Sequence, residues 1–208
     1  MEEMVNMRKS WKQLAIDTAT KYVYLSLVID SKEVDCIYEE GFNNHSVTVI
    51  PHLAEMLKRE KIELTDIDEL IVGIGPGSYT GVRIAVTIAK MIGYLNKITI
   101  KKVSSLALMA SSVSSGFVLA GIDARRGNAF LGLFEVTDQS VIRKKTDCLE
   151  NLEEYLKNLD LKPKLVFEGR PNIEKIIVSD LLETVADPAT LVPNYLQVTE
   201  AERNKCQN

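Results

Sequence analysis

The order of secondary-structure elements that the sequence predicts restricts its fold more than any other feature. Three strand-like segments come first, and alternating helices and strands follow them. The predicted strands are residues 13–20 (running into a polar turn), 22–29, 32–40, 69–74 and 98–103, and the predicted helices are residues 44–60, 80–96 and 104–112. This β-β-β-α-β-α-β order, up to residue 103, predicts an α/β protein with a mixed sheet that carries helices on its faces.

The second half of the chain carries weaker signals. Pro163 should keep any helix from continuing, and a turn is expected at residues 123–128. The predicted strands are residues 117–122, 129–136 and 165–167, the predicted helices are 149–158 and 173–182, and residues 191–196 form a short terminal element.

Composition and charge exclude several classes of protein. The 208 residues are 46% hydrophobic and 26% charged, as in ordinary globular proteins. A net charge of −4 and the lack of a long run of Lys and Arg argue against a chain that binds nucleic acid by itself. Three scattered cysteines, Cys36, Cys148 and Cys206, form neither a disulfide framework nor a metal motif. We therefore expect a cytoplasmic protein without a signal peptide or a membrane-spanning helix.

A glycine-rich loop, Gly75-Pro76-Gly77-Ser78-Tyr79-Thr80-Gly81, precedes the second helix. Such a loop can hold a phosphate through its backbone N–H groups. It is not a Walker loop, however, because no Gly-Lys-Ser/Thr follows, and Pro76 interrupts the dinucleotide pattern. A rigid strand-to-helix turn capped by Ser78 or Thr80 is the simpler interpretation, and we favour it.

Small residues repeat every four positions along the helix that follows this loop. They are Gly81, Ala85, Ala89 and Gly93. Small side chains at this spacing let another backbone approach closely. The other positions are also largely apolar, so this helix should be buried on nearly all sides. One face covers the sheet, and the other needs either the helix of residues 44–60 or a second protein chain.

The sequence offers few candidates for catalysis. Asp17 ends a buried strand beside Thr18, where a carboxylate can hold magnesium or a water molecule, but turn chemistry is the simpler role. His45 and His52 lie about 10 Å apart along one helix, which is too far for a shared metal ion. We predict no catalytic residue, no metal site and no cofactor, with Asp17 and Thr18 as weak candidates for cofactor binding.

Several motifs in this order closely resemble the TsaB (YeaZ-like) family. They are Leu14-Ala15-Ile16-Asp17-Thr18-Ala19-Thr20, His45-Ser46 before a helix with Pro51, Gly75 to Arg83, Val103-Ser104-Ser105-Leu106, Asp123-Ala124-Arg125 and Pro193-Asn194-Tyr195-Leu196. The resemblance covers residues 13–128 well, and Gly75–Arg83 is its most specific part. The chain departs from the family at Ala19, where serine is usual, and at Gln197, where arginine is usual. The second departure weakens any role for the tail, and the first removes a hydroxyl group from a possible phosphate turn.

The resemblance implies the fold shared by actin, heat-shock ATPases and sugar kinases (ASKHA), with two lobes. We expect the first lobe at residues 1–103 and a shortened second lobe at residues 104–208. In the catalytic relative TsaD, a metal-binding His-x-x-x-His follows the strand after the Gly-Pro-Gly helix. Ser105 and Met109 occupy the two places in this chain, and neither replaces an imidazole ligand.

The resemblance therefore implies a non-catalytic subunit of the bacterial complex that makes N6-threonylcarbamoyladenosine at tRNA position 37. It implies binding and activation of TsaD together with the ATPase TsaE, a homodimer in isolation, and contact with tRNA only through the complex. The implied interface uses two helices of the first lobe. Its predicted residues are Gly81, Val82, Ala85, Ala89, Gly93, His45, Val49 and Leu53.

Two other hypotheses remain. A glycoprotease-type or ATP-binding enzyme of the ASKHA superfamily is one, and tight binding of ATP with magnesium by the isolated chain would favour it. A remnant of a small-molecule kinase is the other, which ranks last because the chain is short for two complete lobes.

Overall fold

The computed structural model describes residues 9–41 and 45–196 and contains two β-sheets. In the first sheet the spatial order is β10-β5-β4-β1-β2-β3, where β1 pairs parallel with β4 and antiparallel with β2. In the second it is β8-β7-β6-β9. The strands are β1 (Lys12–Asp17), β2 (Tyr22–Ile29), β3 (Lys32–Glu40), β4 (Glu69–Gly73), β5 (Thr99–Val103), β6 (Gly116–Asp123), β7 (Asn128–Val136), β8 (Val141–Asn151), β9 (Lys164–Val166) and β10 (Glu183–Val185). The helices are α1 (His45–Glu60), α2 (Tyr79–Asn96), α3 (Ser105–Ala110), α4 (Leu152–Lys157) and α5 (Ile173–Ile177), with short 3-10 turns η1 (Leu64–Asp66) and η2 (Pro188–Thr190).

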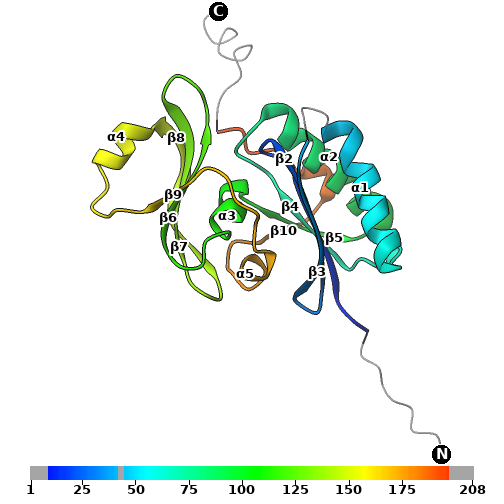
Figure 1. Cartoon of the computed structure of the whole chain (residues 1–208). Coiled ribbons are helices and arrows are strands. Elements are labelled where there is room, and N and C mark those ends of the chain that lie inside the picture. The colour runs from blue at the N-terminus through cyan, green and yellow to red at the C-terminus, as the bar shows by residue number, and fades with distance from the viewer. Residues whose placement is uncertain (1–8, 42–44, 197–208) are drawn as a thin grey trace, which may run out of the picture.

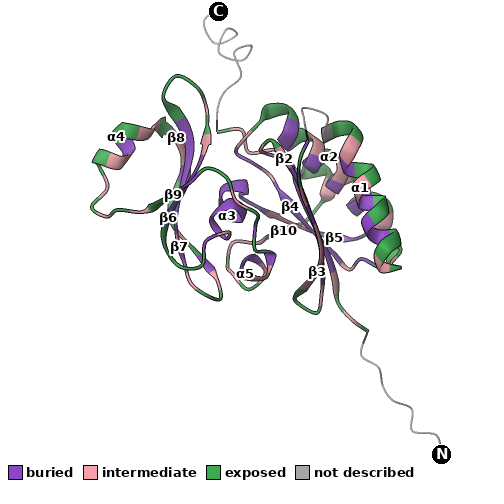
Figure 2. Cartoon of the chain, in the orientation of Figure 1, coloured by how far each residue is buried: buried purple, intermediate pink, exposed green. Residues whose placement is uncertain are grey.

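Helices and sheets alternate in layers across the molecule (Figure 1). Helices α1 and α2 cover the outer face of the six-stranded sheet, α3 and α5 lie between the two sheets, and α4 lies on the far side of the four-stranded sheet. Each interface between layers has its own core of buried apolar side chains. In Figure 2 the buried residues follow the strands and α3, whereas the outward sides of α1 and α2 are largely exposed. The predicted α/β fold and the β-β-β-α-β-α-β order of the first half are confirmed.

The prediction for residues 141–151 was wrong. This stretch forms the long edge strand β8, whereas the sequence predicted no strand there and a helix from Leu149. Leu149 instead pairs with Phe130 of β7, and the helix begins only after Asn151, whose side chain accepts hydrogen bonds from two backbone N–H groups of α4. Because β8 is an edge strand, its many charged residues face solvent and hide the alternation that marks a half-buried strand.

One further helix prediction needs correction. Helix α5 stops at Ile177 rather than at residue 182, since Ser179 Oγ donates to the carbonyl of Ile176 and accepts from the N–H of Leu181, which turns the chain out of the helix. Pro51 lies inside α1, which runs without interruption from His45 to Glu60.

The end of the described chain returns to the first sheet. Strand β10, which the sequence did not predict, pairs antiparallel with β5, and Leu191 is buried in the core beneath α1 and α2. Residues 191–196 form no helix or strand, but the N–H of Asn194 donates to the carbonyl of Ile74 at 2.7 Å. Residues 183–196 thus contact the first sheet, and the division into two lobes at residue 103 stays a prediction.

One buried lysine ties α5 to two loops. Lys175 is 7% exposed, and its ammonium group donates to the carbonyl oxygens of Val113, Ser114 and Thr137 at 2.5–2.9 Å. We expect Lys175→Met to lower the free energy of unfolding by about 1–3 kcal/mol, because carbonyls in a partly buried site lose their donor. Urea unfolding measures this loss, and the exposed Lys162→Met is the control. Equal stability of the two variants would contradict the prediction.

Candidate functional site

Asp17 lies where the two sheets approach each other. It ends β1, is 7% exposed, and its Oδ1 accepts hydrogen bonds from the N–H of Ala19 at 2.9 Å and from Ser105 Oγ at 3.0 Å. Gly73 of β4 makes room for this carboxylate, since a Cβ there would lie 2.5 Å from Asp17 Cγ. The Asp17 carboxylate thus joins β1 to the start of α3, which is a structural task.

Thr18 faces away from this junction. Its hydroxyl donates to the carbonyl of Gly81 at 2.6 Å and accepts from the N–H of Ala85 at 3.2 Å, and the residue is fully buried. The hydroxyl therefore fastens the turn after β1 to α2. This corrects the expectation that Thr18 could take part in binding a cofactor.

Three N–H groups of the glycine-rich loop donate hydrogen bonds within the chain. The N–H of Gly75 donates to Ser105 Oγ at 3.0 Å, and that of Ser78 donates to the carbonyl of Ala19 at 2.7 Å. Ser78, one of the two predicted cap residues, is the N-cap of α2. Its Oγ accepts a hydrogen bond from the N–H of Gly81. The interpretation of this loop as a rigid, capped turn is confirmed.

A cavity of about 300 Å³ opens between the sheets beside Asp17. Its wall combines aromatic, apolar and charged side chains. They are Asp17, Thr20, Lys21, Tyr22, Tyr24, Tyr38, Ser105, Met109, Ile122, Asp123, Phe167 and Glu168, together with Gly169 and Pro171. Ser105 and Met109, which the resemblance placed at the metal-binding positions of the catalytic relative, both line it. Residues 9–41 and 45–196 hold no group of three or more histidine, cysteine or acidic side chains suited to a metal ion.

The stripe of small residues on α2 faces the chain's own sheet. Ala85 and Ala89 are fully buried, and a Cβ at Gly81 would lie 2.0 Å from the carbonyl oxygen of Thr18. A Cβ at Gly93 would lie 2.5 Å from Ile100 of β5. Small residues are needed here because α2 sits close against β1 and β5.

This burial corrects part of the predicted interface. Gly81, Val82, Ala85, Ala89 and Gly93 of α2, and Val49 and Leu53 of α1, belong to the internal core and present no surface to a partner. A large side chain at Ala85 would overpack the monomer instead of blocking assembly alone. The His45 side chain lies outside what the structure describes. The assignment of an interface to these two helices stays a prediction.

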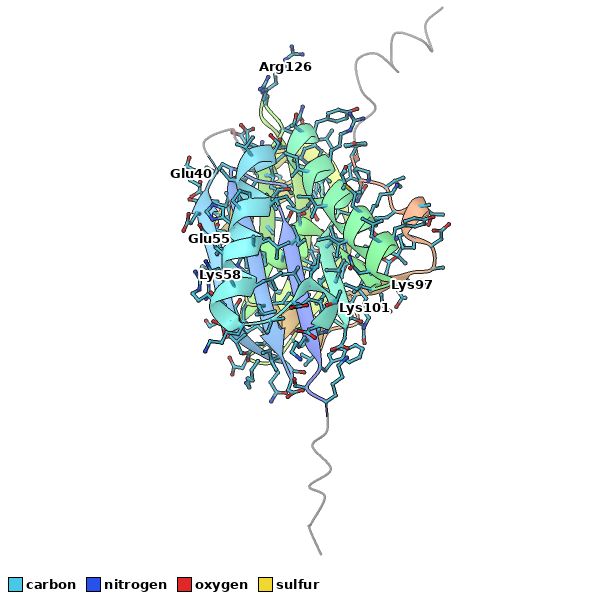
Figure 3. All side chains as sticks on the ribbon, turned by 90° about the vertical axis from the view of Figure 1, so that its right-hand side faces the viewer. Glu40, Glu55, Lys58, Lys97, Lys101 and Arg126 are labelled. Atoms are coloured by element: carbon cyan, nitrogen blue, oxygen red, sulfur yellow. The ribbon has the colours of Figure 1, made fainter. Side chains whose placement is uncertain are left out.

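The solvent side of α1 and α2 carries the apolar residues that the sequence analysis passed over. Val47, Ile50 and Ala54 are exposed on α1 at helical spacing, and Met91 and Leu95 are exposed on α2, 58% and 72% respectively. Ile84 and Ile88 extend the α2 row as partly buried residues. We call these seven residues the helix face. The two helices run beside each other on the side of the molecule that Figure 3 presents.

The N-terminal end of α2 holds an aromatic cluster. Tyr79 stacks on Tyr195 with 4.6 Å between ring centroids, and Arg83 donates from Nε to Tyr195 Oη at 2.7 Å and from a terminal nitrogen to Tyr79 Oη. The guanidinium group also lies 4.2 Å from the centre of the Tyr79 ring. This cluster fastens the last described residues to the N-terminal end of α2.

The chain is similar to known proteins over most of its length. A family model described as "TsaD: tRNA N6-adenosine threonylcarbamoyltransferase" matches residues 39–198. The tRNA threonylcarbamoyladenosine biosynthesis protein TsaB of Bacillus subtilis (strain 168) is 30% identical over 91% of this chain and 95% of that protein. TsaB of Escherichia coli (strain K12) is 33% identical over 74% of this chain and 64% of that protein.

A solved structure, YeaZ from Pseudomonas aeruginosa, has a TM-score of 0.76 at 21% identity and covers 89% of this chain and 100% of its own. The chain has the ASKHA-type α/β fold that the sequence predicted. No helix among the described residues has both the length and the apolar character to cross a membrane. Because the family model spans more than half of the chain, and the Bacillus subtilis relative matches nearly all of it, the chain belongs to the TsaB (YeaZ-like) family.

Proposed function

We propose that this chain is a non-catalytic subunit of the machinery that makes N6-threonylcarbamoyladenosine at position 37 of tRNA. In this proposal it binds and activates a TsaD homologue, a TsaE homologue joins the complex, and tRNA is reached only through the complex. The names of the relatives in Bacillus subtilis and Escherichia coli support the pathway. The observation that carries the proposal is the exposed apolar helix face on α1 and α2.

The helix face has the character of a docking surface. Apolar side chains that gather on two neighbouring helices usually mark a contact with another protein, whereas single exposed apolar residues carry no such meaning. The rows at Val47, Ile50 and Ala54 and at Ile84, Ile88, Met91 and Leu95 run along both helices. Two paired rows of this kind suit docking against helices of a second chain.

We extend the proposed surface to the cluster of Tyr79, Arg83 and Tyr195 at the N-terminal end of α2. Tyrosine and arginine dominate the binding energy of many interfaces, because they combine large contact area with hydrogen-bonding groups. In this chain Arg83 already holds both rings in place, so little conformational freedom is left to lose on binding.

The cleft supports a non-catalytic role. The Asp17 carboxylate accepts from Ser105 and Ala19, and the N–H groups of Gly75 and Ser78 are bonded within the chain. Polar groups that already have hydrogen-bond partners bind a nucleotide phosphate less well than free groups do. Ser105 and Met109 supply a hydroxyl and a thioether where two imidazoles would be required for a metal site.

The test of the proposal is light scattering after size exclusion, on this chain alone and mixed with the TsaD homologue from the same organism. We expect a self-dimer that exchanges into a heterodimer, because both contacts would use the helix face. A chain that stays monomeric and ignores the TsaD homologue would refute the proposed partner and leave the fold unchanged.

An ATP-binding enzyme is the second candidate, favoured by one observation, the Asp17 carboxylate in the wall of the 300 Å³ cavity. We expect isothermal titration of the isolated chain with ATP and magnesium to show no saturable binding up to about 1 mM, a level at which binding is worth only about 4 kcal/mol. Saturable binding that Asp17→Asn removes would favour the enzyme instead.

A further inference from the structure

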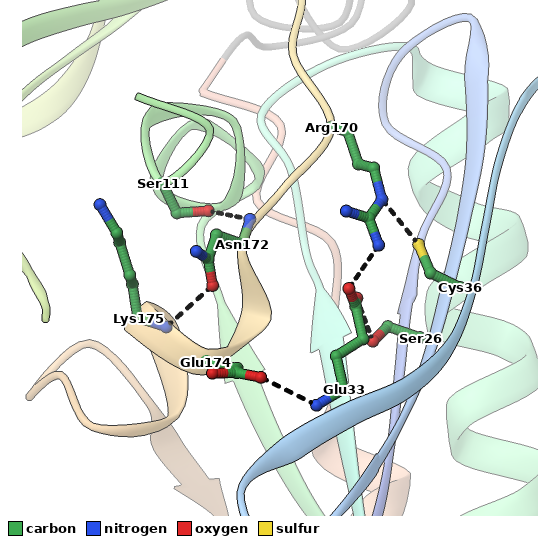
Figure 4. Close-up of polar contacts among 8 residues, drawn as sticks. All are labelled: Ser26, Glu33, Cys36, Ser111, Arg170, Asn172, Glu174 and Lys175. Atoms are coloured by element: carbon green, nitrogen blue, oxygen red, sulfur yellow. Dashed lines mark hydrogen bonds and ion pairs between the residues drawn. The ribbon is translucent and has the colours of Figure 1, made fainter. Parts of the chain in front are cut away.

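A group of polar side chains joins the first sheet to the segment that follows β9 and to α5 (Figure 4). Arg170, in the segment that follows β9, forms an ion pair with Glu33 of β3, and its Nε donates to Cys36 Sγ at 3.2 Å. Two residues later in this segment the N–H of Asn172 donates to Ser111 Oγ at 2.8 Å, which fastens the segment to the end of α3. The backbone that carries Arg170 is therefore held against α3 while the side chain contacts the first sheet.

Two more contacts join the same segments. Glu174 of α5 accepts from the N–H of Glu33 at 3.1 Å and forms an ion pair with Lys32 at 3.0 Å. Glu168 forms an ion pair with Lys21 at 2.6 Å and accepts from the hydroxyl of Tyr22 at 3.2 Å. We call these contacts the interlobe clasp; its members are Lys21, Tyr22, Lys32, Glu33 and Cys36 on the first sheet and Glu168, Arg170 and Glu174 after β9.

The clasp is partly preorganised. The side chain of Glu33 is 16% exposed, and Ser26 Oγ donates to it at 2.7 Å, so the carboxylate is oriented before Arg170 reaches it. The hydrogen bond from Lys21 lowers the pKa of Glu168, and the hydrogen bond from Lys32 lowers the pKa of Glu174. Glu33 joins two of these contacts, since its carboxylate pairs with Arg170 and its N–H donates to Glu174. A single exposed ion pair stabilises a protein little, whereas contacts that share a residue can act together.

The clasp borders the cavity between the sheets. Lys21, Tyr22, Glu168 and the neighbouring Gly169 line this cavity, and at its other end Ser105 Oγ bonds to Asp17. Domain closure in hinged enzymes requires that one side of such a cleft come apart. Here the first sheet is bonded to α3 through Asp17 and Ser105 on one side of the cavity, and to the segment after β9 through the clasp on the other.

We infer that the clasp locks the two sheets in one relative position, so that the cleft does not open by rotation and the chain acts as one rigid body. This inference goes beyond the proposed function, because it concerns the isolated chain and needs no partner. A TsaD homologue bound to the helix face would then meet a second lobe held at a fixed angle.

Cys36 provides a native reporter of opening. Its thiol is half-buried beneath Arg170, and burial raises its pKa to about 11, so it should react slowly with a maleimide at pH 8. The background carries Cys148→Ser and Cys206→Ser, which leaves Cys36 as the single thiol. The tested change, Lys21→Glu, breaks the ion pair with Glu168 without touching Cys36 or Arg170.

We expect Lys21→Glu to raise the labelling rate of Cys36 about tenfold, and the exchanged pair Lys21→Glu with Glu168→Lys to restore it. Lys144→Glu is the matched control, because it breaks an exposed ion pair with Glu135 inside the second sheet. The control should label at the rate of the background. Circular dichroism confirms that each variant is folded.

Equal labelling of Lys21→Glu and the background would overturn the inference, because each contact would then act alone. If a variant fails to fold, the salt dependence of Cys36 labelling in the background protein tests the inference instead. Screening by 1 M salt weakens exposed charge pairs, so labelling of Cys36 should rise between 0.05 M and 1 M sodium chloride. A rate independent of salt would contradict the clasp.

Discussion

Met91→Glu is expected to weaken binding to the TsaD homologue strongly while the chain stays folded. Met91 lies in the middle of the α2 row of the helix face and is 58% exposed, so a glutamate fits the free monomer. In the proposed complex it would bury a charge among apolar side chains without a partner. We expect binding to weaken by about 2 kcal/mol or more, roughly 30-fold, as for the central residues of other interfaces. Isothermal titration against the TsaD homologue measures the change.

The control for this experiment is Val178→Glu. Val178 is 60% exposed, nearly as much as Met91, but it lies at the end of α5, away from the helix face. Both variants should keep the melting temperature of the parent, because exposed substitutions rarely change stability by more than about 0.5 kcal/mol. Normal binding by Met91→Glu, Leu95→Glu and Ile50→Glu would show that the partner does not dock on this face.

Gly81→Ala is expected to destabilise the monomer more than any other Gly→Ala change on α2. A Cβ at this position would lie 2.0 Å from the carbonyl oxygen of Thr18, which is a backbone atom and cannot rotate away. Alanine favours a helix over glycine by about 1 kcal/mol, but the overlap opposes this gain. Since overpacking costs about 1–3 kcal/mol and more when the backbone must move, we expect a net loss of about 2 kcal/mol or more in urea unfolding.

Gly93→Ala is the matched comparison on the same helix. A Cβ there would meet the tip of the Ile100 side chain at 2.5 Å, and a side-chain tip can shift. We expect the helix propensity gain and the packing cost to cancel to within about 1 kcal/mol. If the two variants lost the same stability, the close approach of α2 to the turn after β1 would not be the reason for glycine at position 81.

The α2 helix shows why sequence reasoning proposed as interface residues a set that the structure buries. Small side chains at Ala85 and Ala89 and large ones at Met91 and Leu95 give two apolar sides, and a hydrophobic pattern does not say which side meets the sheet. The small residues face the sheet, because the hydroxyl of Thr18 bonds to the backbone of α2 and holds the helix near β1. The bulky row, spaced at residues 84, 88, 91 and 95, was the available signal for a surface.

The sequence alone predicted the element order of the first half, the Ser78 cap and the family motifs. Each of these depends on residues that lie near one another in sequence. The tertiary structure alone decided the rest. The edge strand β8 and the return of β10 to the first sheet depend on pairing across long separations. The clasp between Arg170 and Glu33 joins residues far apart in the chain, and no local pattern encodes such a contact. Burial, which depends on the packing of whole layers, decided which face of α2 remains open to a partner.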